Sequence, residues 1–234
     1  MQRVQIHTLH LFWFYNRAMK ITCLSASNIE VAKDHSASTR ACHIIAEIAT
    51  GLVGDAAEIE IIPLIDYDLV SCRMCGSCFK TCRCAHDPAF NQLFEKLLAS
   101  DGIFLVCPHY APIPSKVAII LEKMEEMAYL NWCGDPNFKF GLHGKPVGVV
   151  AHGGQTEEAL PYYKTGLVEP LANALASVQM QVVSGGNEWP KGVAFGITCL
   201  TQPEDSIFVT IEHDWPAIRE RIQPLVRNLF QALK

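Results

Sequence analysis

Five cysteines are concentrated in residues 71–87, SCRMCGSCFKTCRCAHD. They are Cys72, Cys75, Cys78, Cys82 and Cys84. Thiolates this close together bind metal ions or iron-sulfur clusters, or they exchange disulfides. A structural zinc site normally combines two C-x2-C pairs separated by roughly a dozen residues, and no second pair or H-x3-H follows here, so zinc is the less favoured ligand. A single redox pair would use Cys75 and Cys78 and leave the other three cysteines without a role.

Iron-sulfur ligation uses more of these cysteines. The spacing C-x2-C-x2-C lets three thiolates of one loop reach three corners of a four-iron, four-sulfur (4Fe-4S) cluster. A fourth ligand at Cys82 has the x3 spacing of bacterial ferredoxins, but there that cysteine binds the other cluster and precedes a proline, where this chain has Arg83. Cys82 is therefore a poor fourth ligand, and Cys84 is the other candidate.

The elements that would position this loop follow an alternating pattern after Met19. Short apolar, β-branched segments predict strands at residues 20–24, 58–63, 102–107, 146–151 and 179–184. Helical patterns lie between them at residues 37–51, 89–99, 115–131 and 157–177, and a last helix follows Asp214 as its N-cap. Several strands are apolar without alternation, as in strands covered on both faces. The sequence thus predicts an α/β fold with a doubly wound, five-stranded parallel sheet in three αβα layers.

We expect one domain at residues 19–234, preceded by an N-terminal arm at residues 1–18. Histidines interrupt the apolar part of the arm and no small-residue cleavage site follows it, so it does not read as a signal peptide. The arm is expected to pack against a second subunit or against its own domain. Residues 185–213 break the alternation with two strand-like runs, which predict a hairpin or an excursion before the last helix.

Composition excludes several classes of function. The formal net charge is -5 and no run of Lys or Arg occurs, so nucleic acid and acidic membrane surfaces are not expected partners. The longest apolar runs are far shorter than the roughly 20 residues of a membrane span. The chain has ten cysteines, but it is long and its content of hydrophobic residues, 50%, is enough for a full core. These properties favour a reducing, cytoplasmic compartment over a secreted disulfide framework.

Three loops follow predicted strands, where open α/β sheets bind their ligands. The first loop is rich in hydroxyl groups and leads into a helix, which would suit a monophosphate, and Arg40 could add a charged contact. The candidate residues are Ser25, Ser27, Ser36, Ser38 and Thr39. The alternative is an ordinary N-cap in a polar loop. Neither G-x-G-x-x-G after the first strand nor G-x-x-x-x-G-K-[ST] occurs in the chain.

The loops after the third and fourth strands would suit a flat aromatic ligand. Three prolines stiffen the sequence CPHYAPIPSK and present His109 and Tyr110 in a fixed shape. After the fourth strand, Gly153 and Gly154 allow the backbone to approach a ligand closely, with Gln155 beside them. The alternative is that Gly153 and Gly154 form a simple turn with no role in ligand binding. His152, just before the glycines, has either a flavin contact or a core role.

Four motifs together resemble the flavodoxin-like NADPH-dependent FMN reductase and iron-sulfur flavoprotein family. They are KITCLSAS with HSAST, the cysteine segment, DGIFLVCPHYAPIPSKV and KPVGVVAHGGQ, over roughly residues 19–180. The resemblance implies a flavodoxin-like fold in which the first loop binds the FMN phosphate. It implies that the isoalloxazine ring lies between two sets of residues: Pro108, His109, Tyr110, Ala111, Pro112 and Ile113, and Gly153, Gly154 and Gln155. The chain departs from the family in having SAS for the usual G-S-P-R, and His109 for a small aliphatic residue.

The same resemblance favours Cys84 as the fourth cluster ligand, because C-x2-C-x2-C-x5-C is the arrangement of the iron-sulfur flavoproteins. The implied metal ligands are therefore Cys72, Cys75, Cys78 and Cys84. Other reductases of the family keep a cysteine-rich loop with no cluster, which is the alternative.

The resemblance implies an FMN-dependent redox protein in which NAD(P)H reduces flavin, quinone or another small acceptor, with no acid or base side chain required. The first alternative is an iron-sulfur flavoprotein that carries electrons to ferredoxin-like partners. The second alternative is a zinc-stapled, non-redox binding module. The arm and the resemblance both favour a homodimer or homotetramer.

Overall fold

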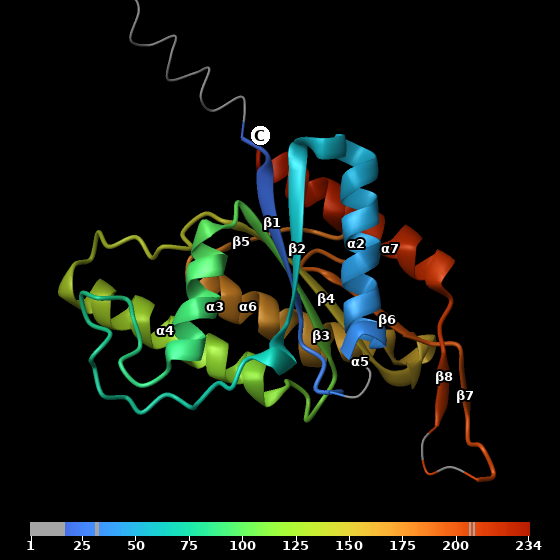
Figure 1. Ribbon diagram of the computed structural model, residues 1–234. Coiled ribbons are helices and arrows are strands. Elements are labelled where there is room, and N and C mark those ends of the chain that lie inside the picture. Colours follow the sequence, from blue (N-terminus) through green and yellow to red (C-terminus); the bar gives the residue numbers. More distant parts are fainter. Residues whose placement is uncertain (1–16, 31–32, 206, 208) are drawn as a thin grey trace, which may run out of the picture.

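The computed structural model describes residues 17–30, 33–205, 207 and 209–234 (Figure 1). The predicted N-terminal arm lies outside these residues except for Arg17 and Ala18, so its packing remains a prediction. Among the described residues, no helix has the length and apolar character needed to cross a membrane.

A parallel sheet forms the centre of the molecule, in the order β2-β1-β3-β4-β5. Its strands are β1 (Met19–Ser25), β2 (Ala57–Pro63), β3 (Gly102–Pro108), β4 (Pro146–Thr156) and β5 (Gln181–Val182). Neighbouring strands pair in parallel throughout this path. The predicted doubly wound parallel sheet is confirmed, and the first four strands begin within one residue of their predicted starts.

The prediction for the fifth strand was wrong in extent. β5 pairs only with Pro146 and Val147 of β4, while a sixth strand, β6 (Val193–Ile197), pairs with β4 further along, from Val150 onward. Two short strands thus share one edge of the 11-residue β4. Gly192 precedes β6 with φ of 148°, and a Cβ there would lie 2.5 Å from the carbonyl oxygen of Val149, so this approach requires glycine.

Residues 185–213 form a strand of the main sheet and a hairpin, and the hairpin is one of the two alternatives predicted for this segment. The first strand-like run is β6 in the main sheet, and a separate antiparallel hairpin follows, formed by β7 (Cys199–Thr201) and β8 (Thr210–Glu212). In Figure 1 this hairpin projects from the rest of the molecule. All six residues of β7 and β8 are exposed, so the hairpin packs little of its surface against the domain.

Helices cover both faces of the sheet. α2 (Ala37–Val53) and α7 (Trp215–Ala232) share one core cluster with Phe104 and Val106 of β3. α3 (Pro88–Ala99), α4 (Ser115–Gly134) and α6 (Glu169–Ser177) share the other cluster with Ile103 and Leu105. Successive residues of β3 therefore enter opposite cores, which explains why the strand is apolar without alternation.

The predicted helix at residues 157–177 is divided. It consists of a 3-10 turn (Glu157–Ala159), α5 (Leu160–Tyr163), a π turn (Lys164–Val168) and α6. Pro170 has no N–H and its ring crowds the preceding turn, and the wider π turn just before it relieves this conflict. The division places α5 beside the end of β4.

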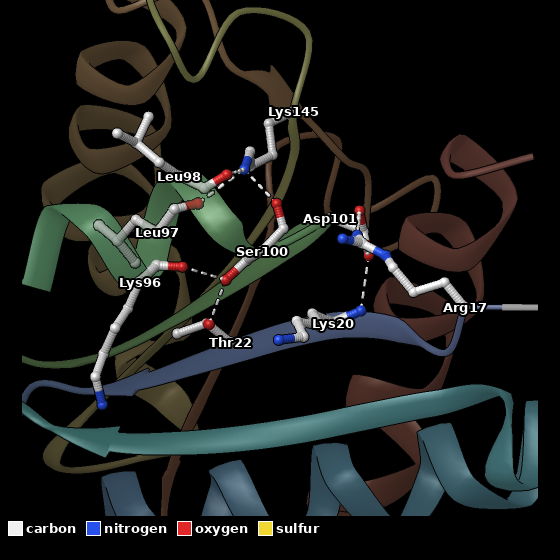
Figure 2. A network of polar contacts seen from close by, with 9 residues as sticks. All are labelled: Arg17, Lys20, Thr22, Lys96, Leu97, Leu98, Ser100, Asp101 and Lys145. Atoms are coloured by element: carbon white, nitrogen blue, oxygen red, sulfur yellow. Dashed lines mark hydrogen bonds and ion pairs between the residues drawn. The ribbon is translucent and has the colours of Figure 1, made fainter. Parts of the chain in front are cut away.

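A polar network joins the amino ends of three strands (Figure 2). The Lys145 ammonium, just before β4, donates to the carbonyl oxygens of residues 97, 98 and 100 at the end of α3. Asp101 accepts a hydrogen bond from the backbone N–H of Lys20 in β1, at 2.7 Å, and pairs with Arg17. The Thr22 and Ser100 hydroxyls also share a buried hydrogen bond. This network holds β1, β3, β4 and α3 together at one edge of the sheet.

Candidate functional site

The carboxyl ends of β1, β3 and β4 bring three loops to the opposite edge of the sheet. Ser27 after β1 lies close enough to the Tyr110 hydroxyl after β3 to oppose the rise in pKa that burial causes in that hydroxyl. The His109 N–H donates to the carbonyl oxygen of His152 at 2.7 Å, and His152 Nε2 lies 2.7 Å from Ser38 Oγ. The three loops predicted to hold a ligand are therefore joined to one another directly.

The hydroxyl groups of the first loop form a buried cluster. Thr39 Oγ1 lies 2.9 Å from Ser25 Oγ and 3.1 Å from Ser36 Oγ. Ser36 is the N-cap of α2 and accepts from the Thr39 N–H, so the cap that sequence analysis offered as the alternative is present. Because these hydroxyls bond to one another, a phosphate here would replace some of their mutual hydrogen bonds. The guanidinium of Arg40 lies elsewhere, over the Trp215 ring at 4.4 Å.

His152 connects the first and fourth loops from inside the protein. It is buried, stacks on Phe195 with ring centroids 4.9 Å apart, and shares a hydrogen bond with Ser38. Burial, with a smaller contribution from His213, lowers the pKa of His152 to about 3, so the imidazole is neutral at physiological pH. A neutral imidazole can donate to Ser38 from Nε2 and leave the serine O–H free to donate elsewhere.

The loop after β3 forms a tight, exposed turn. The Tyr110 N–H donates to the Pro112 carbonyl oxygen at 2.8 Å, and Ala111 has φ of 60°. Ala111 and Pro112 are exposed, and Tyr110 is 36% exposed. Burial of part of the ring raises the pKa of Tyr110, and the nearby Ser27 side chain opposes this rise.

Gly153, Gly154 and Gln155, predicted in a loop, belong to the last part of β4 and have a neighbour that the sequence did not reveal. A Cβ at Gly153 would lie 2.3 Å from the Tyr163 hydroxyl oxygen, whereas a Cβ at Gly154 would meet nothing within 4 Å. The Tyr163 hydroxyl also accepts the Gln155 N–H at 3.0 Å. Gly153 is thus required by Tyr163 of α5, while Gly154 and Gln155 are exposed at the edge of the sheet.

An imidazole and a phenol meet beside these two loops. His109 Nε2 lies 3.1 Å from the Tyr162 hydroxyl, and their ring centroids are 5.2 Å apart. The Tyr162 side chain is 51% exposed, whereas its neighbour Tyr163 is buried. Sequence analysis did not select Tyr162, because it lies 53 residues from His109 and in a segment predicted as uniform helix.

The cysteine loop lies between β2 and α3 and encloses a small cavity of about 20 Å³. The cysteines that line it are Cys72, Cys75, Cys78 and Cys84, together with side chains that include His86 and Lys123. Cys82 accepts a hydrogen bond from Asn131 Nδ2 at 3.6 Å and does not line this cavity. Within the part of the chain that the structure describes, no group of three or more His, Cys, Asp or Glu is arranged to hold a metal ion.

The backbone of the cysteine loop is folded back on itself. Three non-glycine residues, Met74, Lys80 and Cys82, have positive φ angles of 50°, 64° and 48°. Asn131 of α4 accepts the Lys80 N–H at 2.7 Å, and Asn91 of α3 accepts the Cys84 N–H at 2.8 Å. Side chains of two helices therefore hold the loop in this shape.

Lys123, which lines the cavity, forms a buried ion pair with Asp87. Lys123 Nζ lies 3.1 Å from Asp87 Oδ2 and 3.4 Å from Cys84 Sγ, and both charged side chains are at most 2% exposed. Burial opposes ionisation of Asp87, but the N–H groups of Phe90 and Val70 and the Lys123 ammonium hold its pKa below the usual value. The cysteine cavity thus contains a fixed positive charge beside Cys84.

Comparison with known proteins gives a match to the family model described as NADPH-dependent FMN reductase, over residues 19–189. Comparison with curated proteins found no match. An oxidoreductase of Corynebacterium diphtheriae is similar in structure, with 16% identity, a TM-score of 0.57, and 93% of this chain and 98% of that chain covered.

Two further solved structures share the fold. RosB, with a bound formylriboflavin phosphate intermediate, has 19% identity and a TM-score of 0.59, and the match covers 92% of this chain and 79% of RosB. A flavodoxin variant of Fusobacterium nucleatum bound to flavin mononucleotide has 12% identity and a TM-score of 0.51, with 93% and 99% covered. These likenesses show a flavodoxin-like fold.

Proposed function

The chain belongs to the NADPH-dependent FMN reductase family and is an NAD(P)H-dependent FMN oxidoreductase; we propose that it reduces flavin, quinone or another small acceptor. One observation supports the position of FMN at the carboxyl edge of the sheet. The segments at the carboxyl ends of β1, β3 and β4 are hydrogen-bonded to one another there, through His109 with His152 and His152 with Ser38. When bound, FMN supplies hydride transfer, and the protein sets its orientation.

We assign the phosphate to the N-terminus of α2 and its hydroxyl cluster, and the ring to the two loops beyond it. The phosphate residues are Ser25, Ser27, Ser36, Ser38 and Thr39. The ring residues are Pro108, His109, Tyr110, Ala111, Pro112 and Ile113 on one side, with Gly153, Gly154 and Gln155 on the other. Arg40 is left out of this assignment because its guanidinium lies over Trp215.

Binding of FMN and of riboflavin to the flavin-free protein tests the assignment. We expect Ser38→Ala to weaken FMN binding by roughly tenfold, as for the loss of one hydrogen bond to a charged group, and to leave riboflavin binding nearly unchanged. Ser177→Ala, whose hydroxyl bonds within α6, is the matched control. Equal losses of affinity for both flavins would contradict the phosphate assignment.

Stopped-flow mixing of the FMN-loaded protein with NADPH and with NADH tests the reaction. Rapid bleaching of the flavin by either nucleotide is expected from the reductase. If neither NADPH nor NADH reduces the flavin, the result would favour an electron carrier with ferredoxin-like partners.

We also propose that the cysteine cavity holds a 4Fe-4S cluster bound by Cys72, Cys75, Cys78 and Cys84. A cluster presents its iron atoms at four separate corners, so its ligands surround a cavity, whereas the ligands of a single ion converge on one point. The four cysteines line one cavity of about 20 Å³, which supports this ligand set, and the loop must open further to admit a cluster. The cluster would supply one-electron transfer.

Protein prepared without oxygen and assayed for iron and acid-labile sulfide tests this part of the proposal. Cys84→Ser is expected to lose most of the iron, and Cys82→Ser, its matched control two residues away, to retain it. The opposite pattern would make Cys82 the fourth ligand. A wild-type protein that binds FMN but contains no iron or sulfide would end the cluster proposal alone.

A further inference from the structure

The hydrogen-bonded pair of His109 and Tyr162 lies beside both loops assigned to the flavin ring. The His109 ring is held by its backbone bond to His152 and by contact with Tyr163, 5.8 Å away between centroids. Tyr163 is in turn fixed by the Gln155 N–H. The imidazole therefore has a fixed position between the two loops, while the Tyr162 phenol extends towards solvent.

We propose that Tyr162, supported by His109, donates the proton that a quinone needs when the reduced flavin transfers a hydride to it. The inference rests on the proposed reductase function and adds a proton donor to it. Among the proposed acceptors, quinones suit this pair of side chains because their reduction requires a proton at oxygen.

The step balances in atoms and electrons. One quinone oxygen receives a hydride, with two electrons, from the reduced flavin, which is thereby oxidised. The other oxygen gains the electron density of an oxyanion and takes the proton of the Tyr162 hydroxyl. The Tyr162 oxygen then takes the Nε2 proton of His109, while water supplies a proton to the other nitrogen of the same ring. The quinone becomes a hydroquinone without a further reductant.

The other phenols of the site are less suited to this role. The Tyr163 hydroxyl is buried and already accepts the Gln155 N–H. The Tyr110 hydroxyl lies beside Ser27, and the His109 ring is hydrogen-bonded to Tyr162 and not to Tyr110. Tyr162 combines an exposed side chain with an imidazole at hydrogen-bond distance, which allows it to meet an acceptor and to be reprotonated.

The test separates proton-dependent from proton-independent oxidation of the flavin. Protein reduced by NADPH is mixed with benzoquinone, which takes a proton, or with ferricyanide, which takes electrons alone. In Tyr162→Phe the benzoquinone rate is expected to fall by roughly a hundredfold, and the ferricyanide rate by much less. His109→Gln is expected to give the same pattern. Tyr129→Phe, an exposed tyrosine of α4, is the matched control.

A binding measurement without turnover completes the test. Hydroquinone is expected to bind the oxidised, FMN-loaded Tyr162→Phe protein roughly tenfold more weakly than wild type, because a hydrogen bond is lost. Equal benzoquinone rates and equal hydroquinone affinities in wild type and Tyr162→Phe would overturn the inference. If the wild-type flavin is not reduced by NADPH or NADH, the proposed function fails instead.

Discussion

His152 is a buried, neutral imidazole whose protonation state makes folding sensitive to acid. Its folded pKa of about 3 lies below the ordinary value of 6.5, so below pH 6.5 the unfolded chain binds a proton that the folded chain does not. The stabilisation from neutral His152 is therefore complete above pH 6.5 and is lost as the pH falls towards 3. We expect about 2 kcal/mol of this loss between pH 7.5 and pH 5.

Urea unfolding at pH 7.5 and pH 5 checks this prediction. His152→Gln keeps an N–H donor for Ser38 but does not titrate, so its unfolding free energy should fall less between the two pH values than that of wild type. Other titrating groups are common to both proteins and cancel in the comparison. An equal fall would mean that His152 is accessible to protons in the folded protein.

Lys123 and Asp87 form an ion pair whose disruption should be costly because both side chains are buried. Lys123→Met leaves the Asp87 carboxylate buried without its cation, and we expect a loss of about 3 kcal/mol in the free energy of unfolding. Lys96→Met is the matched control, because Lys96 and Glu60 are each more than 40% exposed and such pairs contribute under about 1 kcal/mol. Similar losses in the two variants, measured by urea unfolding, would contradict the buried-charge argument.

At the scale of elements, the end of β4 is fitted to α5 through Gly153. Gly153→Ala would place a Cβ against the Tyr163 hydroxyl, which cannot move easily because its ring is buried. We expect this change to lower the free energy of unfolding of the flavin-free protein by roughly 1–3 kcal/mol. Gly154→Ala should change it by less than about 0.5 kcal/mol, since its Cβ would face open space. If the two alanine variants are equally stable, Tyr163 is not a fixed neighbour.

Elements with strong local patterns could be predicted from the sequence. The first four strands and the Asp214 cap of α7 depend on nearby residues, and the structure confirms them. The fifth strand and the helix at residues 157–177 depend on tertiary contacts. β6 joins the sheet because β4 extends far enough to pair with it, and the π turn before Pro170 is a packing adjustment within an otherwise helical pattern.

The candidate site also contains some residues that the sequence predicts and others that only the structure reveals. Spacing selects three cysteines and the family resemblance adds Cys84, and the structure places these four around one cavity. The pairs of His109 with Tyr162 and of Lys123 with Cys84 join residues 53 and 39 positions apart, so neither has a local signature. The sequence predicts that Gly153 makes room for a ligand, whereas its close neighbour in the structure is Tyr163 of α5.

For the whole molecule, the β7–β8 hairpin is an appendage that contributes little to folding. Both strands are exposed along their length, and isolated hairpins are marginally stable in water. Replacing residues 199–212 by a short Gly-Ser linker should change the free energy of unfolding by less than about 1 kcal/mol and preserve FMN binding. A large loss, measured by thermal or urea unfolding, would show that the hairpin supports the domain.

The single-domain organisation, the arm at residues 1–18 and the homodimer or homotetramer remain predictions. They depend on surfaces between copies of the chain or on residues outside the described range. Sedimentation of the chain with and without residues 1–16 would measure the contribution of the arm to assembly.

The polar network at the amino ends of the strands should make the sheet stiffer there than at the loops assigned to FMN. Lys145 and Asp101 fasten β1, β3 and β4 together, far along the strands from the loops assigned to FMN. Backbone amides near this fastening should therefore exchange with deuterium more slowly than those of the ligand loops. A cofactor can then enter and leave by local opening of the loops at the carboxyl ends of the strands, while the strand register at the amino ends stays unchanged.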